Sequence, residues 1–155
     1  ESFSVSKNTL KALINADTII AVGTTSLRTL ESLYWLGVKK KENKEENLFL
    51  LHQWEAYELP ATLSYKESLA CLLNHLEKNG EETLVCRTSL LIMPGYQFKS
   101  AKALITNFHQ PRSTLLLLVA AFYGEGWKKV YEHALENGYR FLSYGDSSLL
   151  WRKDG

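Results

Sequence analysis

The stretch Thr106-Asn-Phe-His-Gln-Pro-Arg-Ser-Thr-Leu115 decides the fold that this sequence predicts. It follows the short apolar run Ala103–Ile105 and precedes the longer apolar run Leu115–Phe122. A short apolar run, a polar loop with a proline and a long apolar run together predict a strand, a loop and a helix. Open α/β sheets bind ligands at the carboxyl ends of their strands, so this loop is the first candidate for a site.

The loop brings together side chains of several chemical kinds. It offers the carboxamide of Asn107, the imidazole of His109, the guanidinium of Arg112 and the hydroxyls of Ser113 and Thr114. Histidine titrates near neutral pH, so His109 is a candidate proton carrier. A lone histidine is more often structural than catalytic, but the polar residues around this one favour a functional role.

A second unit of the same kind lies earlier in the chain. Thr18–Val22 is rich in β-branched residues and predicts a buried strand, and Leu27–Gly37 predicts a helix that its final glycine ends. The turn Gly23–Ser26 combines hydroxyls with the free N–H groups of a helix start, which suits a carboxylate, a phosphate or a ribose. Ser and Thr are also ordinary N-cap residues, so a purely structural role stays open. Arg28 opposes the helix macrodipole, which favours an anion or a carboxylate beside it.

A third polar turn follows the segment Tyr139–Tyr144, which predicts a final strand. Asp146 in this turn offers a carboxylate, although aspartate is equally common in turns and helix caps. Tyr144 beside it can stack on a base or face a cationic centre. If the strands run parallel, the three polar turns meet at one edge of the sheet, and this convergence predicts a site there.

The other segments continue the alternation of strands and helices. Ser64–Asn79 predicts an amphipathic helix in which Ser64 and Glu67 form a capping box. The charge run Lys39–Asn47 has no apolar anchor and predicts a solvated, mobile loop. The chain therefore predicts a single α/β domain over residues 1–155, with a largely parallel sheet and helices on both of its faces. Further strands are predicted at Glu1–Lys7, Leu48–Leu51 and Thr83–Met93, and further helices at Asn8–Asn15 and Trp127–Asn137.

The composition narrows the class of protein. Hydrophobic residues make up 45% and charged residues 23%, as in ordinary globular proteins, and the net charge of +1 is not that of a typical nucleic-acid binder. The longest apolar run is too short to span a bilayer, so no membrane association is predicted.

Cys71 and Cys86 form no disulfide framework, which favours the cytoplasm. Cys71 with His75, and His52 with Glu55, are pairs without a third ligand, so no metal site is predicted. The chain starts without a methionine in a strand-like pattern, which predicts the C-terminal part of a longer protein.

Four segments occur in a fixed order: Ala21–Ser32, Met93–Phe98, Thr106–Leu116 and Tyr139–Asp146. Together they resemble the C-terminal portion of the S-adenosylmethionine:tRNA ribosyltransferase-isomerase family, the queuosine-pathway enzymes usually called QueA. The resemblance covers most of the chain outside Lys39–Cys86, which is interpreted as an inserted or extended segment. The sequence has His-Gln-Pro-Arg where the family more commonly has His-Leu-Pro-Lys, and a pair of serines after Asp146 where the family has Ala-Met. These departures indicate a divergent branch.

The resemblance implies an enzyme that transfers and isomerises the ribosyl group of S-adenosylmethionine onto 7-aminomethyl-7-deazaguanine in tRNA. The product would be epoxyqueuosine, with adenine and methionine released. The expected partner is tRNA, S-adenosylmethionine is a substrate rather than a cofactor, and the fold is part of a larger α/β barrel-like catalytic domain. The chain alone is expected to be inactive, because the N-terminal half that completes the site is missing.

The resemblance also implies roles for the polar residues. His109 and Asp146 fit the proton-transfer roles by residue type, and which of them is the base stays open. Arg28 and the turn before it fit contacts to the methionine carboxylate or the ribose. The alternatives are a non-catalytic nucleotide- or RNA-binding module and an enzyme with a different ribosyl acceptor. The predicted substrate-binding residues are Gly23, Thr24, Thr25, Ser26, Arg28, Asn107, Phe108, Arg112, Ser113, Thr114 and Tyr144.

Overall fold

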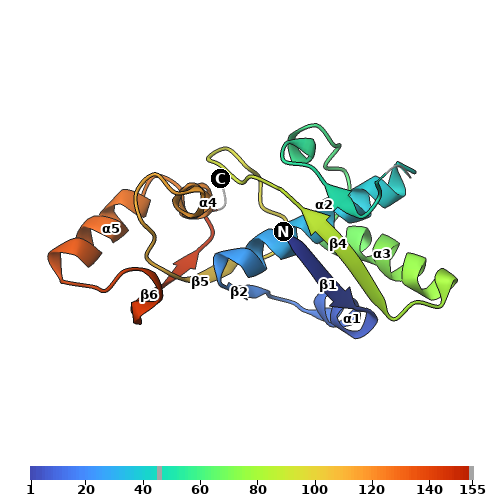
Figure 1. Ribbon diagram of the computed structural model, residues 1–155, viewed down its shortest axis with the longest axis horizontal. Helices are drawn as coiled ribbons and strands as arrows, with labels where there is room; N and C mark the ends of the chain where they lie inside the picture. Colours follow the sequence, from blue (N-terminus) through green and yellow to red (C-terminus); the bar gives the residue numbers. More distant parts are fainter. Residues whose placement is uncertain (45–46, 154–155) are drawn as a thin grey trace. The chain divides into compact units, whose positions relative to one another are not determined.

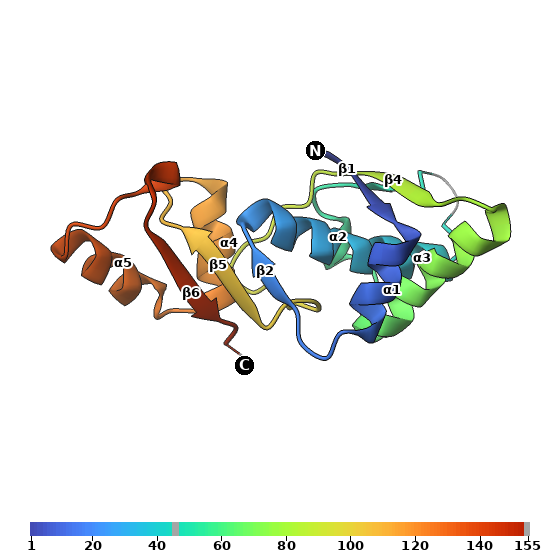
Figure 2. The same ribbon diagram turned by 90° about the horizontal axis from the view of Figure 1, so that it is seen from below.

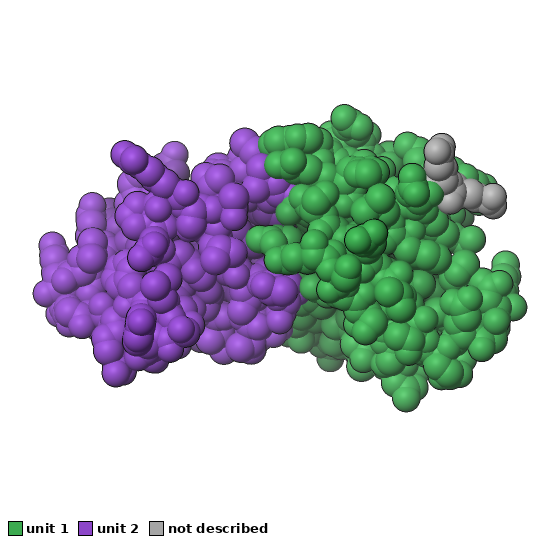
Figure 3. Space-filling view, viewed as in Figure 1, with its two compact units in different colours: residues 1–19, 28–90 green, residues 20–27, 91–155 purple. Residues whose placement is uncertain are grey.

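The computed structural model describes residues 1–44 and 47–153. The chain divides into two compact units (Figure 3). The first unit comprises residues 1–19 and 28–90, and the second comprises residues 20–27 and 91–155. The organisation as one domain with an inserted segment stays a prediction.

The first unit combines helices with a small sheet, and its described elements are β1 (Ser2–Ser6), α1 (Lys7–Asn15), the part of α2 (Thr24–Lys41) beyond residue 27, β3 (Leu50–Leu51), the 3-10 helix η1 (Glu55–Tyr57), α3 (Tyr65–Asn79) and β4 (Thr83–Thr88). The strand order is β1–β4–β3. β1 runs antiparallel to β4, and β3 runs parallel to it. Helices α1, α2 and α3 lie on the same side of the β1–β4 pair (Figures 1 and 2).

The amphipathic helix predicted from its capping box is confirmed as α3. The Ser64 hydroxyl accepts a hydrogen bond from the backbone N–H of Glu67 (3.1 Å), and the Glu67 carboxylate accepts one from the backbone N–H of Ser64 (2.7 Å). The two bonds satisfy donors that a helix start otherwise leaves free. The buried side of the helix is formed by Ser68, Leu69, Leu72 and Leu76.

Helix α2 is longer at both ends than the sequence predicts. It begins at Thr24 and continues through Gly37 to Lys41, so the predicted stop at Gly37 is wrong. The glycine has a packing role instead, because a Cβ atom there would clash with the hydroxyl and the carbonyl oxygen of Ser68 in α3. The Ser68 hydroxyl also donates to the carbonyl oxygen of Tyr34. The backbones of α2 and α3 therefore approach closely at position 37.

Replacement of Gly37 by alanine is expected to destabilise the protein, although alanine is the better helix former by about 1 kcal/mol. The added methyl group requires the backbone of α3 to move, and overpacking of this kind costs about 1–3 kcal/mol. We expect a net loss of roughly 1 kcal/mol in the free energy of unfolding, measured by urea denaturation. The control Asn74→Ala, on the exposed side of α3, should cause no loss. A gain in stability for Gly37→Ala would disprove the close helix contact.

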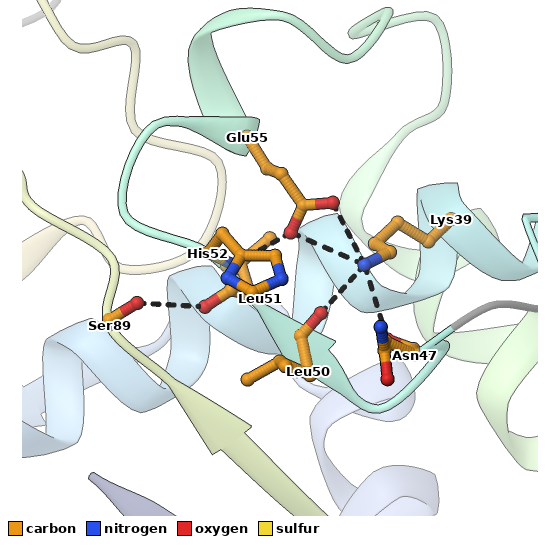
Figure 4. Close-up of polar contacts among 7 residues, drawn as sticks. All are labelled: Lys39, Asn47, Leu50, Leu51, His52, Glu55 and Ser89. Atoms are coloured by element: carbon orange, nitrogen blue, oxygen red, sulfur yellow. Dashed lines mark hydrogen bonds and ion pairs between the residues drawn. The ribbon is translucent and has the colours of Figure 1, made fainter.

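The charge run predicted as a solvated loop contains a buried cation. The Lys39 side chain is 2% exposed and lies in the last turn of α2. Its ammonium group donates to the carbonyl oxygens of Asn47 (3.3 Å) and Leu50 (2.6 Å) and to the Glu55 carboxylate (2.9 Å) (Figure 4). The prediction is wrong for Lys39 because these tertiary partners satisfy its donors inside the protein. Residues 45 and 46 of the predicted loop lie outside the described residues.

The second unit also combines a sheet with helices, and its described elements are β2 (Ile20–Val22), the first turn of α2, β5 (Ala103–Asn107), α4 (Thr114–Tyr123), α5 (Trp127–Glu136), the 3-10 helix η2 (Leu142–Tyr144) and β6 (Ser147–Trp151). The strand order is β2–β5–β6, with β2 parallel and β6 antiparallel to β5. The protein thus has the predicted mixture of helices and strands. The predicted largely parallel sheet is wrong, because both sheets contain one parallel and one antiparallel pair.

Two strand predictions in the second unit are corrected by the structure. β2 is not buried, since Ile20 is 46% and Val22 is 65% exposed; it stands at the end of the strand order. The segment Tyr139–Tyr144 forms no strand, because Leu142 adopts a φ of +61° and the backbone turns into η2. The final strand is β6, which begins three residues after this segment ends.

Helix α4 supplies much of the core of the second unit. Leu118, Val119, Ala120 and Phe122 are buried, and Ser113 caps the amino end of the helix. In the part of the chain that the structure describes, no helix is both long enough and apolar enough to cross a bilayer. The apolar run that predicts α4 therefore serves packing within this unit.

Candidate functional site

Three polar segments meet at one edge of the β2–β5–β6 sheet (Figure 1). The backbone N–H of Gly23, directly after β2, donates to the carbonyl oxygen of Ile105 in β5 (2.8 Å). β5 ends at Asn107, which is paired with Ser147 at the start of β6. Asp146 therefore lies beside the end of β5, but it precedes an antiparallel strand instead of following a parallel one. A cleft shared by all three segments stays a prediction.

The hydroxyl residues of the first segment lie inside the first turn of α2, not in a turn before it. The backbone N–H of Leu27 donates to the carbonyl oxygen of Gly23 (3.2 Å), so helical hydrogen bonding starts at Gly23. Thr24 is 7% exposed, whereas Thr25 and Ser26 are exposed. The first N–H groups of a helix have no partner within it, so these two hydroxyls and the adjacent N–H groups can bind an anion or a ribose.

Arg28 has a carboxylate partner that the chain itself provides. Its Nη1 atom lies 3.0 Å from Oε1 of Glu1, and both residues belong to the first unit. The sequence predicts an anion beside Arg28 but does not tell a ligand from a side chain. Because the Glu1 side chain is half-exposed, a substrate carboxylate could displace it, and that contact stays a prediction.

His109 is buried, with 9% of its surface exposed. Its Nε2 atom lies 2.9 Å from the hydroxyl of Thr106, and its backbone N–H donates to the hydroxyl of Tyr131 (3.0 Å). Burial lowers the pKa of His109 below its ordinary value, because a charged imidazolium loses hydration inside the protein. The ring is therefore neutral at physiological pH, which is the form that accepts a proton.

Phe108 anchors the histidine loop through a buried aromatic cluster. It is 2% exposed, and its ring meets those of Tyr131 (5.4 Å) and Tyr139 (5.7 Å) edge to face. Phe141 packs against it at 5.5 Å. This aromatic cluster fixes the backbone on either side of the loop, so the structure gives Phe108 a positioning role. A direct contact between Phe108 and a substrate stays a prediction.

The far end of the histidine loop lines a pocket. Ser113 accepts a hydrogen bond from the backbone N–H of Leu116 (3.2 Å) and donates to the carbonyl oxygen of Gln110 (2.9 Å). Arg112 is exposed and adopts a φ of +60°, a conformation that is uncommon outside glycine. The pocket has a volume of about 310 Å³ and is lined by Arg112, Ser113, Thr114, Leu116, Leu117, Ala120 and Trp127.

Asp146 stabilises its own loop through hydrogen bonds with Arg140. Its Oδ2 atom accepts hydrogen bonds from the backbone N–H and from Nε (3.2 Å) of Arg140. These bonds lower the pKa of Asp146, so the carboxylate stays ionised near neutral pH. Gly145 has a φ of +124°, and a Cβ atom there would lie 3.0 Å from Nη2 of Arg140. The backbone N–H of Leu142 donates to the carbonyl oxygen of Phe108 (2.8 Å), which joins this loop to the histidine loop.

Two further predicted residues lie at the ends of elements beside these loops. Asn107 is half-buried at the last position of β5, and Tyr144 in η2 is 71% exposed. The Tyr144 ring is therefore accessible for stacking, and its contact with a base stays a prediction. Sequence reasoning missed Tyr131, Trp127 and Arg140. The only local signal for them was the aromatic spacing of Trp127 and Tyr131 on one face of a predicted helix.

The sequence offers two pairs of residues as possible metal ligands. One pair makes other contacts, and neither belongs to a larger group of ligands in the described part of the chain. The Glu55 carboxylate accepts a hydrogen bond from the backbone N–H of His52 (2.6 Å) and binds Lys39. Within residues 1–44 and 47–153, no group of three or more His, Cys, Asp or Glu side chains could hold a metal ion. Cys71 and Cys86 are free thiols.

Comparison with known proteins connects this geometry to a family. A family model described as "Queuosine biosynthesis protein" matches residues 1–150. The S-adenosylmethionine:tRNA ribosyltransferase-isomerase of Chelativorans sp. (strain BNC1) is 43% identical over 137 residues, which are 88% of this chain and 27% of that protein. The protein of the same name from Polynucleobacter asymbioticus is 38% identical over 157 residues, covering 98% of this chain and 32% of that protein. This chain thus spans between about a quarter and a third of the length of these relatives.

A solved structure is similar over nearly the whole chain. The crystal structure of S-adenosylmethionine tRNA ribosyltransferase from Thermotoga maritima aligns with a TM-score of 0.62 and 34% identity. The alignment covers 96% of this chain and 40% of that one. The similarity therefore extends through both compact units, including the segment interpreted from sequence as an insertion.

Proposed function

Because this chain belongs to the queuosine biosynthesis protein family, we propose that it is part of a tRNA-modifying enzyme. The enzyme transfers the ribosyl group of S-adenosylmethionine to 7-aminomethyl-7-deazaguanine in tRNA and isomerises it to epoxyqueuosine, in the cytoplasm. The family match over residues 1–150 is the observation that carries this proposal. S-adenosylmethionine enters as a substrate, and no separate cofactor is proposed.

The polar edge of the second unit supplies groups of the kinds that this reaction needs. A base must remove a proton from the carbon beside the sulfonium, and the neutral imidazole of His109 is suited to accept it. Asp146 is ionised, so it suits the stabilisation of positive charge or a second proton-accepting step. While its bonds to Arg140 persist it carries no proton to donate, which makes His109 the better candidate for the first acceptor and for a later donor.

The remainder of the site is proposed to come from outside this chain. The chain corresponds to between about a quarter and a third of the length of these relatives, so a larger α/β catalytic domain has room for further tRNA and donor contacts. We expect this chain alone to show no turnover. The full-length protein is therefore the appropriate material for every activity measurement.

The test is an assay for adenine release by the full-length protein. S-adenosylmethionine and a tRNA that carries 7-aminomethyl-7-deazaguanine are expected to give stoichiometric adenine and modified tRNA. Calorimetry with S-adenosylmethionine alone gives the binding control. Donor binding without adenine release, with the correct tRNA present, would favour the non-catalytic module instead. Release that requires another acceptor would retain the ribosyl chemistry and change the substrate.

The role of Asp146 can be separated from that of its partner by two matched variants. Asp146→Asn removes the charge, and Arg140→Gln weakens the contact that holds it. If Asp146 takes part in chemistry, Asp146→Asn lowers turnover by roughly 10²-fold, and Arg140→Gln changes it only a few-fold. Steady-state adenine release measures both. Equal losses in the two variants would reduce Asp146 to a loop-positioning residue.

A further inference from the structure

The pocket between the histidine loop and α5 has no assigned ligand. Its wall is apolar and comes from Leu116, Leu117 and Ala120 of α4, and Trp127 of α5 adds an aromatic ring. The Trp127 ring is itself held edge to face against Tyr131 (5.7 Å). A volume of about 310 Å³ lies at the lower end of the range for small-molecule sites. The pocket is therefore of a size for a ring system, not for a chain segment.

Arg112 adds a polar donor to this apolar lining. Its residue is exposed, and among the residues that the structure describes its guanidinium forms no hydrogen bond or ion pair. Its backbone has the strained φ of +60°, and strained residues tend to gather at ligand sites. A guanidinium presents N–H donors in one plane and accepts nothing. The matching ligand thus has flat apolar faces and at least one hydrogen-bond acceptor at its edge.

We propose that this pocket binds the adenine ring of the ribosyl donor, with Trp127 as its stacking residue and Arg112 as a donor to its ring nitrogens. Adenine has the required flat faces, and its ring nitrogens N1, N3 and N7 accept hydrogen bonds, while its exocyclic amine donates. The proposal rests on the proposed function for the identity of the donor. It concerns binding of adenine and adds four residues, Leu116, Leu117, Ala120 and Trp127, to those that sequence reasoning assigned to substrate.

The first test is the variant Trp127→Leu in the full-length enzyme. Stacking of a base on an aromatic side chain contributes to affinity, so its loss should raise the KM for S-adenosylmethionine by roughly 10-fold. The inhibition constant of free adenine should rise by a similar factor, while the KM for tRNA stays unchanged. Trp127→Phe should restore most of the affinity. Trp54→Leu is the matched control, because Trp54 is a half-exposed tryptophan in the first unit.

A second variant keeps the proposal testable if Trp127→Leu does not fold. Leu117 is 41% exposed, so Leu117→Glu places a carboxylate in the pocket at little cost to the core. It should weaken donor and adenine binding, whereas Leu135→Glu, at the 68% exposed Leu135 of α5, should not. Circular dichroism checks that all variants are folded.

The outcomes distinguish this inference from the function on which it rests. An active enzyme in which Trp127→Leu and Leu117→Glu leave donor and adenine affinity unchanged would overturn the pocket assignment and leave the proposed function intact. A selective rise in the KM for tRNA would also overturn it, since the pocket would then hold an RNA nucleotide. If the full-length protein releases no adenine at all, the proposed function fails, and titration with free adenine still decides whether the pocket binds the base.

Discussion

Replacement of His109 by glutamine in the full-length enzyme is expected to lower turnover by roughly 10²–10⁴-fold, the usual contribution of a general base. Glutamine keeps a polar group near Thr106, whose hydroxyl lies 2.9 Å from Nε2 of the histidine, but it cannot carry the proton. Adenine release under saturating substrates measures the effect. His133→Gln is the matched control, because His133 is an exposed histidine in the last turn of α5.

The pH dependence separates catalysis by His109 from a structural role. Since burial lowers the pKa of His109, kcat/KM should stay level from neutral pH down to about 6.5 and fall below it as the ring becomes protonated. That limb should disappear in His109→Gln. The free energy of unfolding should also decrease as the pH falls from about 6.5 through the lowered pKa, because the unfolded chain binds the proton more readily. If His109→Gln removes this stability effect but leaves turnover undiminished, His109 is a core residue only.

Replacement of Lys39 by methionine is expected to lower the free energy of unfolding by about 3–5 kcal/mol, the cost of breaking a buried ion pair on one side. The variant leaves the Glu55 carboxylate and the carbonyl oxygens of Asn47 and Leu50 without their donor. Lys41→Met is a close control, because Lys41 is exposed two positions along the same helix. Urea denaturation of the folded protein gives both values. Equal stabilities of the two variants would show that the Lys39 contacts contribute nothing.

Glu55, the partner of Lys39, gives the stability of the protein a dependence on pH. Burial opposes ionisation of Glu55, but the backbone N–H of His52 and the Lys39 ammonium outweigh it, so the pKa of Glu55 is lowered. Its contribution to stability is therefore complete above about pH 4.3 and is lost as the pH falls through the lowered pKa. Glu55→Gln should reduce this acid sensitivity. An unchanged acid unfolding profile would indicate that the ion pair has no net effect.

Local patterns in the sequence predict the positions of most helices and of the polar loops. The capping box at Ser64, the apolar run of α4 and the hydroxyls after β2 all depend on neighbouring residues, and each is present in the structure. Strand direction depends on pairing between distant residues and could not be predicted. β6 runs antiparallel to β5, and the residues that pair lie far apart in the sequence. The turn at Leu142 falls inside the segment predicted as a strand, where no local propensity distinguishes it.

The errors at Gly37 and Lys39 have the same origin. Glycine is a common helix terminator and lysine runs are usually solvated, so local rules predict an end and a loop. Contacts with Ser68 and Glu55 override both rules, and those contacts come from segments more than ten residues away in the sequence. Local rules thus fail where a tertiary partner decides the outcome.

The candidate site was likewise predictable only in part. The histidine loop was predictable because its polar residues are contiguous. Only folding brings Trp127 to the pocket and Arg140 to Asp146. Sequence reasoning also treated Phe108 as a ligand contact; its ring is buried among Tyr131, Tyr139 and Phe141, and contact with a substrate stays a prediction. Assignment by residue type identifies the chemistry that is available, whereas the burial of each side chain depends on the tertiary structure.

The contact between α2 and α3 affects how variation among relatives is interpreted. At position 37 only a hydrogen atom fits against the backbone of Ser68, so selection for a folded chain alone would keep glycine there. An unvarying residue at this position would record the geometry of two touching helices and carry no information about substrate or reaction. Invariance in the exposed first turn of α2, at Thr25 or Ser26, has no such packing explanation and would be the more informative sign of a bound ligand.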